Sequence, residues 1–137
     1  MANNSLNNPG IAHSGNIHIA NAIHSIFEHH PSFNDKKGSL GKGFITKTKP
    51  HLNKGMNSLN KFAEHIGKVE MHYQSVLDGL DSSTVGLEDR VHLEDSAKQH
   101  VINLKSLHEK QKITLTKITE LFLQLSKERL KEMKQQR

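Results

Sequence analysis

A seven-residue apolar repeat, beginning near residue 50, constrains the fold of this chain more than any other feature. Between residues 50 and 80, apolar side chains recur at alternating spacings of four and three residues, which places them on one face of an α-helix. The same spacing returns between residues 97 and 125. The segment from Asp81 to Thr84 is typical of a turn followed by a helix N-terminus. We therefore predict two long amphipathic helices, at about 50–80 and about 87–135.

These two helices predict an all-α fold, either a helical hairpin or a small bundle, in which each helix contributes one apolar stripe. Glu70 is a polar exception in the first stripe. His108 and Gln111 interrupt the second stripe, and we expect them either to set the register of the helices or to weaken the packing. The predicted hairpin core comes from both stripes and consists of Leu52, Met56, Leu59, Ile66, Tyr73, Leu77, Leu80, Val101 and Leu104.

The composition agrees with a thin helical fold. Only 34% of the 137 residues are hydrophobic and 4% are aromatic. Even with the nine glycines added, the apolar share stays below the roughly 45–50%, glycine included, of an ordinary globular domain. So few apolar side chains leave little material for a multilayered core, but they suffice for one stripe per helix. The length allows one domain.

The N-terminal part is predicted to contain one shorter helix. Residues 1–15 are rich in Asn and carry no charged side chain, so we expect them to be disordered. A short amphipathic helix is predicted over residues 16–30, with Asn16 as its N-cap and Pro31 just beyond its end. Its apolar face would consist of Ile19, Ile23, Ile26 and Phe27.

Residues 31–49 are predicted to be a flexible basic linker. Three glycines lie among several lysines in this segment, and glycine is costly to order in a helix or a strand. Pro50 then suits the first turn of a new helix, because its missing N–H has no helical partner there anyway. The helical hairpin domain would thus occupy residues 50–137.

The two long helices differ in predicted length. At 1.5 Å per residue they would be about 45 Å and about 70 Å long, so the C-terminal part of the longer helix extends past its partner. Its apolar side chains there must be covered by the N-terminal helix, by a second subunit or by a different protein. This mismatch predicts self-association or a protein partner, with an interface formed by Leu115, Ile118, Leu121, Phe122 and Leu125.

Charge is distributed in three blocks. The net formal charge is +4 over residues 1–60, −4 over residues 61–100 and +5 over residues 101–137. Such blocks can pair within the molecule, pair between subunits or attract a polyanion. A nucleic acid or an anionic membrane is therefore an alternative partner, although Phe44 is the only Phe, Tyr or Trp among the lysines that would contact it: Lys36, Lys37, Lys42, Lys47, Lys49 and Lys54.

The sequence offers little support for catalysis. It contains no Cys, which excludes disulfides, thiolate metal sites and thiol nucleophiles. Gly41-Lys42 is followed by Gly43 instead of Ser or Thr, which departs from a phosphate-binding loop. No two of the eleven His are three or four residues apart, the spacing at which one helix face binds a metal. We therefore expect no enzyme activity, no cofactor and no metal.

The order of elements resembles that of one known family. An uncharged Asn/Ser/Ile-rich start, a short amphipathic helix and a helix–turn–helix whose strongest apolar stripe, at residues 115–125, lies near the C-terminus are similar to small exported components of bacterial type III secretion systems, especially inner-rod and flagellar rod-base proteins. The resemblance implies an export signal at the N-terminus and a polymerisation surface on the last helix. The twelve residues from Ser126 to Arg137, ten of them polar, depart from this pattern.

The predicted location follows from the lack of targeting segments. No apolar run approaches the roughly 20 residues of a membrane-spanning helix, and the N-terminus lacks the basic start and apolar block of a secretory signal peptide. We expect a soluble cytoplasmic protein that, if the resemblance holds, is exported by a non-classical route like that of type III secretion. The expected role is that of a non-enzymatic helical interaction or assembly protein.

Overall fold

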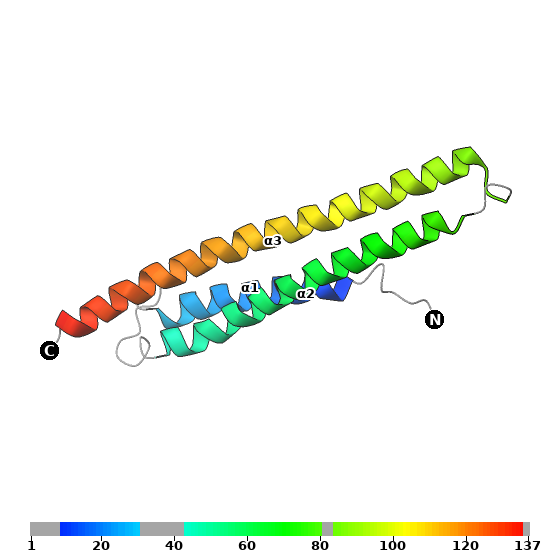
Figure 1. Ribbon diagram of the computed structural model, residues 1–137. Helices are drawn as coiled ribbons and strands as arrows, with labels where there is room; N and C mark the ends of the chain where they lie inside the picture. Colours follow the sequence, from blue (N-terminus) through cyan, green and yellow to red (C-terminus); the bar gives the residue numbers. More distant parts are fainter. Residues whose placement is uncertain (1–8, 31–42, 81–83, 136–137) are drawn as a thin grey trace.

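The computed structural model describes residues 9–30, 43–80 and 84–135, and within them all regular structure is helical. The three helices are α1 (Pro9–His29), α2 (Phe44–Asp78) and α3 (Leu87–Gln135). Figure 1 shows them side by side in an elongated molecule, with α1 and α3 running antiparallel to α2. The prediction of an all-α small bundle is therefore confirmed, and the bounds of α3 agree with the predicted long helix.

One apolar core joins the three helices at one end of the molecule. Here α1 packs against the N-terminal half of α2 and the C-terminal half of α3 (Figure 1). We call this part the three-helix bundle. Its core consists of the buried residues Ile19, Ala22, Ile26, Phe44, Leu52, Leu59, Leu115, Ile118, Phe122 and Leu125.

The helix α1 begins at Pro9, earlier than the predicted start at residue 16. Proline suits a first helical position, because its fixed backbone angle is already helical and it needs no N–H partner. The predicted cap, Asn16, instead lies inside α1, where its Oδ1 accepts a hydrogen bond of 2.9 Å from Gln111 Nε2. The expectation of disorder is thus wrong for residues 9–15; residues 1–8 lie outside the described ranges.

The helix α2 begins at Phe44, and Pro50 lies inside it, not in its first turn. Proline inside a helix costs about 3 kcal/mol or more. The Phe44 side chain is 0% exposed, with its ring centroid 4.8 Å from that of His30 and 5.4 Å from that of Phe122. This burial, worth about 1.5–3 kcal/mol, offsets much of the cost of Pro50. The predicted linker 31–49 is therefore wrong from residue 44 onward, and its first twelve residues lie outside the described ranges.

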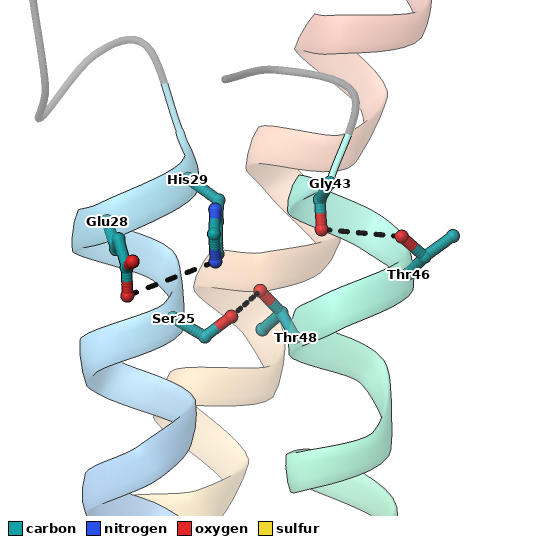
Figure 2. A network of polar contacts seen from close by, with 6 residues as sticks. All are labelled: Ser25, Glu28, His29, Gly43, Thr46 and Thr48. Carbon is teal, nitrogen blue, oxygen red and sulfur yellow. Dashed lines mark hydrogen bonds and ion pairs between the residues drawn. The ribbon is translucent and has the colours of Figure 1, made fainter. Parts of the chain in front are cut away.

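The α1–α2 contact is close because small side chains line it. Ala22 is fully buried, and Ser25 Oγ lies 2.8 Å from Thr48 Oγ1 in a hydrogen bond that joins the two helices. Figure 2 shows this bond where the C-terminal end of α1 lies beside the first turns of α2. A second pair, Ser14 and Ser58, is 3.3 Å apart at the other end of the contact. The two hydroxyl pairs fix the antiparallel register of α1 on α2.

The two polar residues in the α3 stripe connect the helices. Gln111 is only 4% exposed, and its Nε2 donates to the carbonyl of Ala12 at 2.7 Å as well as to Asn16 in α1. His108 Nε2 donates to the carbonyl of Leu59 in α2 at 3.0 Å, and its ring meets Phe62 edge to face. Of the two alternatives for these residues, the geometry supports a role in setting register.

The buried face of α2 is rotated from the predicted one. Leu52, Leu59 and Ile66 are buried as predicted, but Met56 is 51% exposed, so its assignment to the core is wrong. Phe62 and Val69, which are not among the predicted core residues, are almost fully buried. The rotation arises because α2 contacts two helices, α1 and α3, and must bury the face between them.

Candidate protein-interaction surface

The predicted partner interface on α3 is covered by the chain itself. Leu115, Ile118, Phe122 and Leu125 are buried in the core of the three-helix bundle, and only Leu121 stays exposed, at 40%. The N-terminal helix, one of the three covers that the length mismatch allowed, occupies this stripe. The expectation of a free apolar surface at the C-terminal end of α3 is therefore wrong.

The uncovered part of the molecule lies at the opposite end. Since α1 contains 21 residues and α2 contains 35, α1 cannot follow the whole hairpin. Beyond it, residues 69–78 of α2 and 87–104 of α3 face each other without a third helix (Figure 1). We call these two segments the two-helix arm.

The two-helix arm buries little of its apolar surface. Val69 and Ala97 are its only buried residues, and the predicted core residues Tyr73, Leu77, Val101 and Leu104 are only half-buried. Leu80, just after α2, is half-buried as well. Six large apolar side chains of the arm are exposed: Met71, Val76, Leu87, Val91, Leu93 and Ile102.

Two grooves flank the seam between the helices of the arm. Tyr73, Leu77 and Ala97 line both grooves, which have volumes of about 310 Å³ and about 280 Å³. The larger groove also contains ionisable side chains, Glu70, Glu94 and Lys98. The smaller groove contains no Lys, Arg, Asp or Glu, and its other lining residues are His72, Val76, Leu93 and Ser96.

Polar contacts hold the arm together near the bundle. The hydroxyl of Tyr73 is hydrogen-bonded to Nδ1 of His100, and the two rings meet edge to face. Glu70 forms an ion pair of 3.1 Å with Lys105 across the helices. Glu70, the polar exception in the first stripe, thus lies at the edge of the seam, where a carboxylate remains solvated. The contact orders the base of the arm, but exposed ion pairs add only about 0–1 kcal/mol.

A buried histidine lies between the arm and the bundle. His65 is 8% exposed, and burial lowers its pKa below the ordinary value of 6.5. The nearby His100 and Lys68 lower this pKa further, because each adds positive charge close to the ring. His65 is therefore neutral in the folded state near pH 7.

The predicted polyanion contacts do not form one surface. Lys47, Lys49 and Lys54 are exposed on α2, but Lys49 lies on a different helix face from the other two, because two residues rotate a helix by about 200°. Lys47 and Lys54 instead continue a regular row with Lys61 and Lys68, which the sequence analysis did not single out. We call these four residues the lysine row. Lys36, Lys37 and Lys42 lie outside the described residues.

The described ranges contain neither a candidate metal-ion site nor a helix suited to span a membrane. In the described ranges, no three His, Asp or Glu side chains lie close enough together to bind a metal ion. None of the three helices combines the length and the apolar content needed to cross a bilayer.

Comparisons with protein-family models, with curated proteins and with solved structures found no match for this chain.

Proposed function

We propose that this chain is a non-enzymatic helical interaction or assembly protein that binds a protein partner through the two-helix arm. The single observation that carries the proposal is the arm's uncovered seam. Where α1 covers the hairpin, three helices surround the apolar stripe, whereas in the arm two helices leave the predicted core residues of the seam only half-buried.

The arm has the shape and chemistry of a helix-binding surface. A helix of a partner protein that fits the smaller groove would cover Val76 and Leu93 and complete locally the three-helix arrangement that α1 provides in the bundle. Burial of apolar surface contributes roughly 25 cal/mol per Å². The groove offers no ionisable carboxylate or lysine that a partner would have to neutralise.

A structural component or adaptor of a bacterial secretion system is one role of this kind. The order of elements, a short N-terminal helix before a long hairpin, supports the proposal. The continuation of α3 to Gln135, well past its buried stripe, remains a departure from the inner-rod pattern. Since α1 covers that stripe, assembly through the C-terminal end of α3 would require α1 to move.

Site-specific photocrosslinking in the native cells tests the interaction role. A photoreactive residue in place of Val76 or Leu93 should give protein adducts, because both side chains are exposed beside the groove. Ile113 is the matched control, since it is exposed to the same degree as Leu93, 46%, but lies in the bundle half of α3. A lack of adducts at both arm positions would reject the proposal, as would equal adducts at position 113.

The alternative is that the chain binds nucleic acid or an anionic membrane surface through its lysines. The observation that favours it is the lysine row, which places four exposed cationic side chains on one face of α2. Binding that falls steeply with salt and is lost when the row is neutralised would support this alternative.

A further inference from the structure

The lysine row is regular and carries a net positive charge. Its members are spaced seven residues apart, so they succeed one another about every 10.5 Å along α2 and span about 31 Å. All four side chains are exposed, and none forms an ion pair with another described residue. Two carboxylates lie near the row: Glu28 of α1 lines the same surface pocket as Lys47, and Glu64 lies three residues after Lys61 and four before Lys68 on α2. Four lysines against these two carboxylates leave the row with a net positive charge.

A row of carboxylates with the same spacing lies on α3. Glu88, Asp95 and Glu109 are exposed and are separated by seven and fourteen residues. The intervening position is taken by Ile102, which is 57% exposed. We call the three carboxylates the acid row. It also spans about 31 Å and has no ion pair within the described part of the chain.

Two lysines of the described chain do form ion pairs, and they have the same spacing, whereas Lys110 and Lys117, also seven residues apart on α3, form none. Lys98 and Lys105 are seven residues apart on α3, and each forms an ion pair, with Glu94 at 3.4 Å and with Glu70 at 3.1 Å. Neutralisation within the molecule is therefore available to regularly spaced lysines in this fold. The lysine row and the acid row both lack it.

We infer that this chain associates with a second copy of itself, with the lysine row of one molecule lying along the acid row of the next. This inference rests on the assembly role of the proposed function but concerns a second surface, because neither row lines the grooves of the arm. The equal repeat and equal length of the rows allow opposite charges to meet at three of four positions, in either relative direction. Each molecule carries both rows on different helices, so the contact can close as a two-fold dimer with two reciprocal row contacts or continue head to tail.

The strength of this contact should depend on salt. The charges are solvent-exposed, and the screening length falls from about 10 Å at 0.1 M salt to about 3 Å at 1 M. We expect the full-length chain to grow in mass with concentration in about 50 mM NaCl, as measured by size-exclusion chromatography with light scattering. In about 500 mM NaCl its association constant should fall at least tenfold.

Charge-reversed pairs test the two rows directly. One variant carries Lys54→Glu with Lys61→Glu, and the other carries Asp95→Lys with Glu109→Lys. Each alone should associate at least tenfold more weakly than the wild type. An equimolar mixture should regain association, because the acid row of the first variant can contact the lysine row of the second. This restoration also shows that both variants are folded.

A matched control separates the rows from net charge. Lys110→Glu with Lys117→Glu makes the same charge change at the same spacing, outside the rows, and should leave the association constant within about twofold of the wild type. The inference is overturned by a wild-type monomer at low salt, by unchanged association in both reversed variants or by a mixture that stays monomeric. Binding to duplex DNA by a monomeric wild type, lost with Lys54→Glu and Lys61→Glu, would assign the row to a polyanion and also overturn it.

Failure of this inference can be told apart from failure of the interaction role. Arm adducts at positions 76 and 93 without salt-dependent self-association would leave the proposed function standing with a different partner. Salt-dependent, row-dependent self-association without arm adducts would instead reject the arm as the binding surface.

Discussion

Two glycines inside α2 meet different surroundings. A Cβ added at Gly55 would lie 3.2 Å and 3.4 Å from the two terminal methyl carbons of Leu115, a residue that is only 1% exposed. A Cβ added at Gly67 would meet nothing within 4 Å. Gly55 thus allows α3 to approach α2 closely, whereas Gly67 only weakens the helix.

Substitution by alanine should therefore change the free energy of unfolding differently at the two positions. Gly67→Ala should raise the free energy of unfolding by up to about 1 kcal/mol, because alanine is the better helix former. Gly55→Ala should gain clearly less or lose stability, since Leu115 must move within a packed core. Urea denaturation of both variants measures the two changes. An equal gain at both positions would contradict the close packing at Gly55.

His65 predicts a dependence of stability on pH. Burial lowers its pKa in the folded state, so the unfolded chain binds a proton at higher pH than the folded chain does. The free energy of unfolding should therefore fall as the pH drops below about 6.5. His65→Gln should lose less stability than the wild type between pH 7.5 and pH 5.5.

The control for this effect is His72→Gln, seven residues along the same helix at an exposed position. It should follow the wild-type pH dependence. If His65→Gln and His72→Gln show the same slope of stability against pH, His65 does not carry the effect.

At the scale of the helices, periodicity predicted what depends on one helix alone. The bounds of α3 and the C-terminal end of α2 follow from an uninterrupted apolar repeat. The contact face of α2 does not follow from this repeat, because α2 buries the face between two neighbouring helices and Met56 lies outside that face. The starts of α1 and α2 depended on tertiary contacts, through Gln111 and Phe44, that no local pattern reveals.

The candidate site was predicted less well than the fold. The sequence shows that the two long helices differ in length. It does not show which end of the helical hairpin is covered, because this depends on where α1 packs. The clues to its position were the small side chains of α1 and α2, such as Ala22, Ser25 and Thr48, which allow a close antiparallel contact. The lysine row could have been found by testing polar residues, as well as apolar ones, for a spacing of seven.

Burial of Phe44 stabilises the first turns of α2, and a substitution at this position tests that contribution. Phe44→Ala should lower the free energy of unfolding by about 3–5 kcal/mol, since it empties a fully buried site. The Phe27→Ala control concerns a ring that is 50% exposed and should cost about 1 kcal/mol or less. Thermal denaturation followed by circular dichroism measures both. Similar losses in the two variants would show that burial of Phe44 does not hold the start of α2.

In the molecule as a whole, the end formed by two helices is also the end with an excess of acidic side chains. The described segments of the arm carry six acidic and two basic side chains, whereas lysines predominate over acidic residues in the α2 and α3 portions of the bundle. The acidic end is also the end with two helices and an exposed seam. An elongated molecule with unlike ends is suited to directional contacts with other molecules, and this supports an assembly role.

Hydrogen exchange along the full-length chain tests most directly whether three helices cover the apolar core in the bundle while two helices leave it partly uncovered in the arm. We expect backbone amides of residues 69–78 and 87–104 to exchange at least tenfold faster than those of residues 52–66 and 108–125, because local opening of the arm exposes little buried apolar surface. Equal protection along the whole of α2 and α3 would contradict it.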